Sequence, residues 1–147
     1  PLDPKLRDLL GLPRPFDLQW ADPLRLIPAA NAFRDVRFVI PHFGAGFFRE
    51  APMAGAQCEN VHVDTSSSNA WIATQPQRLT LRDVFERALG VFGHERILFG
   101  TDSNVFPAGW RAERLAEQRE ALAGLGLAAG ALEALFGGNA LRLLERR

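Results

Sequence analysis

The sequence predicts an α/β fold in which three parallel strands alternate with helices. Short apolar runs rich in β-branched residues alternate with longer amphipathic stretches, and this order implies right-handed crossovers between strands that lie side by side. The predicted strands are residues 36–40, 60–64 and 96–100. The predicted helices that follow them are residues 47–57, 81–91 and 110–123, with two more at 128–136 and 139–146.

Local signals predict where several elements begin and end. Asp22 precedes Pro23, which is typical of a helix that starts at the proline with the aspartate as its cap. Thr80 and Asp83 have the spacing of a capping box and predict the start of the 81–91 helix. Gly137 and Gly138 predict a separation between the last two helices. The apolar density of residues 36–40 is that expected of a buried strand.

Composition indicates one globular domain and excludes several partner classes. The 147 residues are 47% hydrophobic and 23% charged, and 17 basic residues balance 17 acidic ones. We therefore expect no nucleic-acid partner and no membrane partner. The single cysteine, Cys58, excludes an internal disulfide framework and is compatible with a cytoplasmic location. No secretory signal is visible, and Pro1 at the start suggests that a natural N-terminus is missing.

Each predicted strand ends in residues that can carry chemistry. In parallel α/β folds a ligand lies beyond the carboxyl ends of the strands. His42 follows the first strand, Asp64 closes the second ahead of the hydroxyl cluster at 65–68, and Asp102 follows the third. Because these three ends meet at one edge of a parallel sheet, the sequence predicts a functional site there.

His42 and Asp102 each have two interpretations. His42 is either a buried histidine bonded to a backbone carbonyl, or a metal ligand or base beside metal-bound water. Asp102 is either a helix cap or a carboxylate in an open loop mouth, where it binds a metal or takes a proton from water. Pro107 argues against a helix that starts directly after Asp102, so we favour the functional interpretation.

Other residues near the strand ends are weaker candidates. Asp64 is expected to support the mouth of the site through local turn bonds, with substrate contact as the alternative. Aromatic side chains are usually core residues, but three of them are candidates for an apolar substrate wall. These three are Phe43, Trp71 and Phe106. The other two histidines, His62 and His94, are expected to pack in the strand and to lie in a turn, respectively.

A nucleotide-binding site is a competing interpretation of the glycine-rich turn. Gly44 and Gly46 follow a strand, and Asp64 closes the next strand at about the spacing of a dinucleotide fingerprint. Arg49 stands at the third glycine position, where a bulky cation would obstruct close packing of helix and strand. A nucleotide-binding α/β domain and a non-catalytic module are the alternatives to the enzyme interpretation.

Four segments taken together resemble the amidohydrolase-related branch of the amidohydrolase superfamily. That branch includes metal-dependent hydrolases and enzymes similar to aminocarboxymuconate-semialdehyde decarboxylase. The resemblance covers almost the whole chain after about residue 20 and depends on the order and spacing of the segments. The segments are VIPHFG at 39–44, NVHVDTS at 60–66, RILFGTDS at 96–103 and GNALRLL at 138–144.

The resemblance implies a metal-dependent (β/α)₈ TIM barrel in which the three strands are the sixth, seventh and eighth. His42 would then lie at the metal or beside its activated water, and Asp102 would bind the metal and handle a proton. The ion implied is divalent, with Zn²⁺ favoured. Asn139 and Ala140 match a motif of the closing helix, where a structural role is expected.

The chain also departs from the family pattern. The first-strand His-x-His pair and the fifth-strand histidine are missing, and a barrel needs about 250 residues. We therefore expect residues 1–147 to be the C-terminal part of one barrel domain whose N-terminal half is absent. Such a chain would bind metal weakly, be inactive alone, and associate through exposed sheet edges, for instance as a homo-oligomer.

For the parent protein the resemblance implies hydrolysis of a small carboxylate or carbonyl substrate by a metal-dependent enzyme. Non-oxidative decarboxylation, the reaction of a lyase, is the alternative within the same family. Nothing in these residues separates the two reactions.

Overall fold

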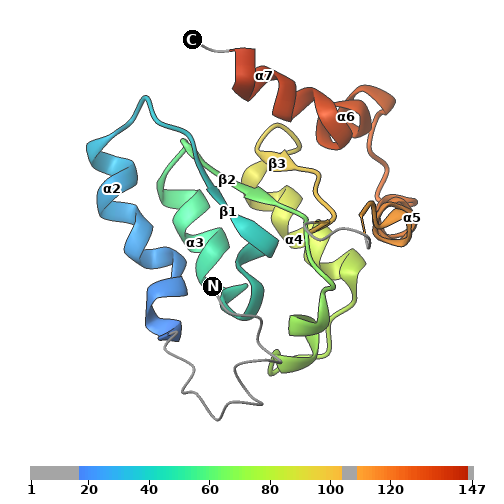
Figure 1. Ribbon diagram of the computed structural model, residues 1–147, viewed down its shortest axis with the longest axis horizontal. Helices are drawn as coiled ribbons and strands as arrows, with labels where there is room; N and C mark the ends of the chain where they lie inside the picture. The colour runs from blue at the N-terminus through green and yellow to red at the C-terminus, as the bar shows by residue number, and fades with distance from the viewer. Residues whose placement is uncertain (1–16, 104–108, 146–147) are drawn as a thin grey trace.

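The computed structural model describes residues 17–103 and 109–145, which form three parallel strands with helices around them (Figure 1). The strands are β1 (Phe38–Ile40), β2 (Val61–Asp64) and β3 (Ile97–Leu98), in the sheet order β1-β2-β3. Val39 pairs with His62, and Asp64 pairs with Leu98. The predicted α/β fold with three parallel strands is confirmed.

The prediction that the first strand is buried is wrong for one of its faces. Ile40 is 6% exposed, whereas Val39 is 41% exposed and Val36, before the strand, is 46% exposed. Successive side chains of a strand point to opposite faces of the sheet. Ile40 packs in the core, and Val39 points to the other face at the outer strand of the sheet.

Helices connect and flank the strands. The 3₁₀ segments η1 and η2 lead into α2, and the π-helical segment η5 joins α6 to α7. Their bounds are η1 (Leu18–Ala21), η2 (Pro23–Leu26), α2 (Ile27–Ala32), η3 (Pro41–Phe47), α3 (Glu50–Gln57), η4 (Ala70–Thr74), α4 (Leu81–Phe92), α5 (Ala112–Leu122), α6 (Ala129–Glu133), η5 (Ala134–Gly138) and α7 (Asn139–Glu145).

Two predicted helix starts are confirmed in atomic detail. The Asp22 carboxylate accepts a hydrogen bond from the backbone N–H of Leu24 at 2.9 Å, and Pro23 is the first residue of η2. Thr80 and Asp83 form a reciprocal capping box at the start of α4. Both caps satisfy backbone N–H groups that the first turn of a helix leaves without partners.

Two other boundaries differ from the prediction. The helix after β1 begins at Glu50 instead of residue 47, because residues 41–47 form the irregular segment η3 with left-handed backbone. Gly137 and Gly138 do not separate two helices by a loop. They lie within η5, where Gly137 has an extended φ of 179° and allows the chain to continue into α7.

The core lies between the sheet and the helices α3 and α4. Small residues of α3 allow α4 to approach closely: a Cβ atom built on Gly55 would lie 2.1 Å from the ring of Phe92. Ala51 and Ala54 are fully buried, and Phe85 of α4 is also fully buried. The apolar face of α4 therefore packs directly on the small side chains of α3.

Arg96 fastens the two helix ends to the sheet just before β3. Its guanidinium donates to backbone carbonyl oxygens at the end of α3, at the start of β2 and at the end of α4. The acceptors are Gly55 (2.8 Å), Cys58 (3.4 Å), Val61 (3.2 Å), Val91 (2.7 Å) and Phe92 (3.2 Å). One side chain thus satisfies several carbonyl groups that helix ends leave without intrahelical partners.

Within the described ranges, none of the helices has the length and apolar character that crossing a bilayer requires.

Candidate active site at the carboxyl edge of the sheet

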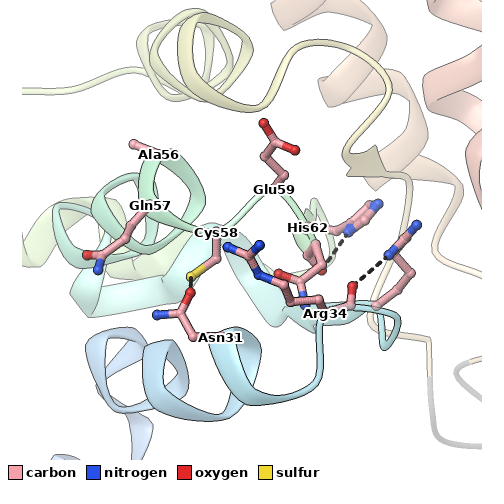
Figure 2. A pocket seen from close by; sticks show the side chains of 9 residues that line it. Asn31, Arg34, Ala56, Gln57, Cys58, Glu59 and His62 are labelled. Atoms are coloured by element: carbon pink, nitrogen blue, oxygen red, sulfur yellow. Dashed lines mark hydrogen bonds between the residues drawn. The ribbon is translucent and has the colours of Figure 1, made fainter.

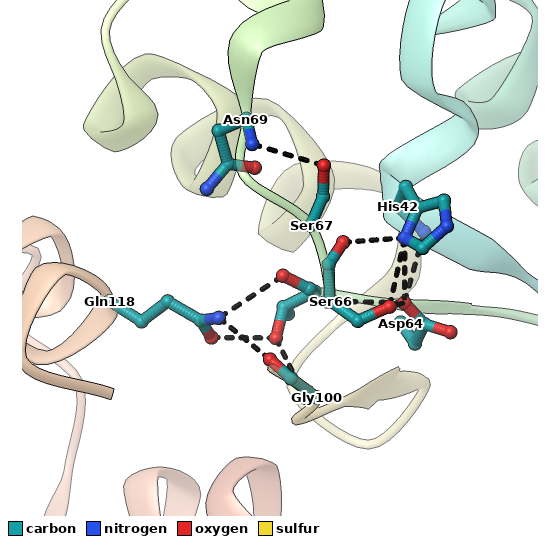
Figure 3. Close-up of polar contacts among 8 residues, drawn as sticks. His42, Asp64, Ser66, Ser67, Asn69, Gly100 and Gln118 are labelled. Atoms are coloured by element: carbon teal, nitrogen blue, oxygen red, sulfur yellow. Dashed lines mark hydrogen bonds and ion pairs between the residues drawn. The ribbon is translucent and has the colours of Figure 1, made fainter. Parts of the chain in front are cut away.

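The ends of β1 and β2 bring His42 and Asp64 into contact. Since the two strands run parallel, both residues leave the sheet at the same edge (Figure 3). The Asp64 carboxylate accepts hydrogen bonds from the backbone N–H of His42 at 2.9 Å and from that of Ser66 at 2.9 Å. It also accepts from the Ser66 hydroxyl. Asp64 therefore holds two chain segments together, which agrees with its expected supporting role.

The backbone turns sharply at His42. His42, Phe43 and Ala45 have φ values of 58°, 54° and 48°, and Gly44 between them has a φ of 85°. The left-handed region costs a residue with a side chain about 1–2 kcal/mol, so three such residues in one turn need support from their surroundings. The hydrogen bond from the His42 N–H to Asp64 supplies part of that support.

The His42 ring has one nitrogen bound to the neighbouring strand end. Nδ1 lies 2.7 Å from the carbonyl oxygen of Ser66 and 2.9 Å from its hydroxyl oxygen. A carbonyl oxygen can only accept, so Nδ1 carries the proton in the neutral ring and Nε2 keeps its lone pair. The side chain is 34% exposed. This is the arrangement of histidines that bind a metal or accept a proton through Nε2.

The chain after β3 reaches the same edge close to Ser66. A Cβ atom built on Gly100 would lie 2.7 Å from the Cβ of Ser66, so only glycine allows this approach. Asp102, two residues further on, is partly exposed and has a left-handed φ of 57°. Its carboxylate has no hydrogen-bond partner among residues 17–103 and 109–145. The first helix described after it begins at Ala112, so Asp102 is not the cap of that helix.

One residue of this edge was missed by sequence reasoning. Gln118 of α5 is fully buried and makes three hydrogen bonds to the chain after β2 and β3. Its only sequence signal is a polar residue at a position where the helix turns toward the core, next to the apolar pair Ala121 and Leu122.

Two of the three aromatic residues proposed for a substrate wall lie in the core instead. Phe43 is 1% exposed, and its ring meets that of Phe85 edge to face with centroids 5.1 Å apart. Trp71 is 9% exposed and packs on Phe48 at 5.3 Å. Neither offers a surface to a ligand in this structure, because the backbone turn at η3 directs Phe43 inward. Phe106, the third, lies outside the described residues.

Of the two glycines in the alternative nucleotide motif, Gly44 has a packing role, whereas a Cβ atom on Gly46 would meet nothing within 4 Å. A Cβ atom on Gly44 would lie 2.6 Å from the Cβ of Ala51, and its φ of 85° favours glycine as well. Gly44 therefore lets the turn after β1 rest against α3. Arg49, at the third position of the motif, is exposed.

A polar cavity of about 630 Å³ lies at the opposite edge, beside the loops that precede β1 and β2 (Figure 2). Its buried histidine, His62, has Nδ1 3.3 Å from the carbonyl oxygen of Asn60. Burial lowers the pKa of His62 below its ordinary value, with Arg96 and Arg37 contributing in the same direction. His62 is thus a packed side chain, as expected, and its burial favours the neutral form of the ring. Cys58 and Arg34 also line this cavity.

His94 is remote from the carboxyl edge. It lies in the turn before β3, with Nε2 3.4 Å from a carboxylate oxygen of Glu95.

The described residues provide part of a metal site. Imidazole Nε2 of His42 and the carboxylate of Asp102 are donors that a divalent cation accepts. A catalytic zinc site takes three protein ligands, and the part of the chain that the structure describes contains no cluster of three or more His, Cys, Asp or Glu that could hold an ion. The two donors are of the kind that a divalent cation binds, but they are fewer than the three protein ligands of a catalytic zinc site.

In parallel α/β folds a ligand binds at the carboxyl edge of the sheet, which is where His42, Asp64 and the chain leading to Asp102 lie. The model of the Amidohydrolase family matches residues 11–146. The chain therefore belongs to the amidohydrolase family, as its sequence motifs suggested. A search of curated proteins found no match.

Solved structures show the same fold. Two crystal structures of an amidohydrolase from Burkholderia multivorans, one with bound zinc and one with bound HEPES, superpose with TM-scores of 0.55 and 0.53 at 24% sequence identity. They match 82% and 81% of this chain but only 49% of their own length. The chain thus spans about half the length of these structures. Its three-stranded α/β domain is consistent with part of a TIM barrel.

Proposed function

We propose that this chain forms the C-terminal part of a metal-dependent hydrolase that acts on a small carboxylate or carbonyl substrate. β1, β2 and β3 would be the sixth, seventh and eighth strands of its barrel. Family membership and the half-length match to zinc-containing and HEPES-containing amidohydrolase structures support this proposal. The missing strands would have to come from outside the described residues.

The contact between His42 and Ser66 carries the proposal. Because the Ser66 carbonyl accepts from Nδ1 at 2.7 Å, Nε2 is left with a lone pair in a partly exposed ring. Asp102 follows β3, the third strand of the sheet, and like His42 it has a left-handed φ. Left-handed residues with side chains cluster at functional sites, where the surrounding structure holds them in place.

Each residue has a defined task in this proposal. His42 and Asp102 would contribute two ligands to a divalent ion, with Zn²⁺ favoured, and such an ion lowers the pKa of a bound water to about 7. Ser66 keeps the His42 ring in the tautomer that presents Nε2. Asp64 holds the His42 backbone in its left-handed turn. Asp102 takes or gives a proton during the reaction.

The expected partner is a small-molecule substrate, and neither nucleic acid nor a membrane is proposed. The equal numbers of basic and acidic residues support this choice. Association with a second barrel half, or with further copies as a homo-oligomer, would cover the free edge of β1. A cytoplasmic location is proposed on the single, buried Cys58.

The test uses the protein extended by any sequence that is encoded upstream of Pro1. Its metal content and its turnover are measured. His42→Gln and Asp102→Asn should each lower kcat at least about 100-fold, as expected for loss of a metal-ligand or acid–base group. His94→Gln, far from the carboxyl edge, should leave kcat and zinc content unchanged. Parent-level turnover in both site variants would refute the assignment.

The same experiment separates the two reactions of the family. Release of CO₂ from a carboxylate substrate, without consumption of water, would show that the reaction is decarboxylation and not hydrolysis. An upstream reading frame that encodes a His-x-His pair would supply the ligands that the described residues lack. Absence of metal from the purified protein, together with binding of NAD, would favour a nucleotide-binding domain instead.

A further inference from the structure

Gln118 joins α5 to the chain segments that follow β2 and β3. Its Nε2 amide donates to the carbonyl oxygens of Thr65 at 3.1 Å and Gly100 at 2.9 Å, and its Oε1 accepts from the Thr65 hydroxyl at 2.6 Å (Figure 3). Both N–H groups and the carbonyl oxygen of the amide are used. A fully buried amide is tolerated when its hydrogen-bonding groups are paired in this way.

These bonds lie beyond the end of the strand pairing. The backbone N–H of Thr65 donates to the carbonyl of Leu98 at 2.9 Å. Past this point the N–H of Gly100 donates at 3.2 Å to the Thr65 hydroxyl and not to a backbone carbonyl. Side chains of Thr65 and Gln118 therefore take over the connection between the two segments where the sheet stops.

The connected segments are those that carry the site. Thr65 stands between Asp64, which holds the His42 backbone, and Ser66, whose carbonyl binds the His42 ring. Gly100 approaches Ser66 closely and precedes Asp102 by two residues. A change in the distance between Thr65 and Gly100 would move the Ser66 carbonyl, which binds the His42 ring, relative to the chain that leads from β3 to Asp102.

We propose that Gln118 is a positioning residue that fixes the Ser66 carbonyl against the His42 ring and sets the spacing between the two ends of the site. A role of Gln118 in catalysis rests on the proposed function, whereas the effect of Gln118 on the His42 ring does not depend on it. An apolar side chain of similar length would fill the same volume but would leave the Thr65 and Gly100 carbonyls without donors.

The ring nitrogens of His42 report this positioning directly. In the 147-residue chain labelled with ¹⁵N-histidine, at a pH where the ring is neutral, the unprotonated nitrogen should be Nε2. In Gln118→Met the two ring nitrogens should share the proton, so that their signals move toward each other. Leu122→Ala is the matched control, because it removes a buried side chain of α5 without touching this network. It should destabilise the chain and leave the His42 tautomer unchanged.

A second pair of variants tests the proposal at Thr65, so that the conclusion does not depend on Gln118→Met alone. Thr65→Val keeps the shape of the side chain but loses the two bonds of the hydroxyl, the one to Gln118 Oε1 and the one from the Gly100 N–H, whereas the residue 65 carbonyl still accepts from Gln118. It should therefore move the His42 ring signals in the same direction as Gln118→Met. Thr65→Ser keeps the hydroxyl and should restore the parent signals. Folded Gln118→Met or Thr65→Val chains with the parent tautomer would overturn the proposal and leave Gln118 as a packing residue.

The outcomes also separate this proposal from the proposed function. If the tautomer follows Gln118 but the protein shows neither metal binding nor turnover, the positioning network stands and the metal-dependent hydrolase does not. If turnover depends on His42 but the His42 tautomer is unchanged in the Gln118 variant, the metal-dependent hydrolase stands and the positioning network does not.

Discussion

The Nδ1 atom of His42 lies 2.7 Å from the carbonyl oxygen of Ser66, although 24 positions separate the two residues in the chain. The acceptor is a backbone group, so side-chain substitution at residue 66 does not remove it. Orientation of the ring therefore depends on where the chain after β2 is held. Asp64 and Thr65 contribute to that placement through their hydrogen bonds to the His42 backbone and to Gln118. Substitutions at these two residues should therefore act on the His42 ring indirectly.

Replacing Asp64 should loosen the turn at His42. Asp64→Ala removes the acceptor of two backbone N–H groups and of the Ser66 hydroxyl. Loss of these charge-assisted bonds should lower the free energy of unfolding by about 2 kcal/mol, measured by urea denaturation. Asp35→Ala, at an exposed turn residue, is the control and should stay near the parent value. Equal stability of the two variants would contradict the supporting role of Asp64.

Gly100 should not tolerate a methyl group. In Gly100→Ala the new Cβ would lie 2.7 Å from the Cβ of Ser66 and 3.4 Å from its backbone. Relief of this clash requires a backbone shift that should cost about 1–3 kcal/mol of stability. Gly130→Ala meets no atom within 4 Å and lies in α6, so it should be neutral or slightly stabilising. Thermal unfolding of both variants, measured side by side, gives the comparison.

Arg96 should contribute strongly to stability without any carboxylate partner among the described residues. Arg96→Met keeps much of the apolar stem but withdraws the donors from five backbone carbonyls. We expect a loss of about 3 kcal/mol, because several partly buried acceptors lose their bonds together. Arg87→Met removes one exposed bond to Gln77 and should cost little. A small effect at Arg96 would mean that water replaces the guanidinium at these carbonyls.

His62 should make the fold sensitive to mild acid. Burial lowers its pKa in the folded state below the ordinary value of 6.5, so the unfolded chain takes up the proton first as the pH falls. The stability that depends on neutral His62 is complete above pH 6.5 and declines as the pH falls from there toward the lowered pKa. Urea unfolding at pH 7.5 and at pH 5.5 should show a smaller decline in His62→Leu than in the parent chain. His94→Leu is the control, and a parent-like decline in His62→Leu would contradict the prediction.

Local sequence signals sufficed for elements whose causes are local. The caps at Asp22 and at Thr80 with Asp83 were predicted and are present, because a side chain within three residues satisfies the free N–H groups of each helix. The alternation of apolar runs and helices likewise predicted the parallel sheet. Placement of His42, Asp64 and the chain leading to Asp102 at one edge followed from the sheet being parallel.

Other features depended on contacts that no local pattern encodes. The inward turn of Phe43 results from left-handed backbone at His42 and Phe43, which Asp64 holds from another strand. The role of Gln118 depends on α5 lying against the ends of β2 and β3, 53 positions from Thr65 and 18 from Gly100. Phe43 carries no local signal of this, and the sequence around Gln118 indicates only a polar residue on the core-facing side of α5 and not the segments that it joins.

The sequence by itself determined the order of strands and helices, their caps, the family and the edge of the sheet where the chemistry would lie. These follow from periodicity, local hydrogen bonding and motif spacing, which act over a few residues or are preserved in the linear order. Tertiary structure alone decided which nitrogen of His42 is free, that Phe43 and Trp71 are core residues, and that Gln118 joins two strand ends. The reason is physical: a tautomer, the burial of a ring and a bond between distant segments are set by neighbours that only the folded chain brings within a few ångströms.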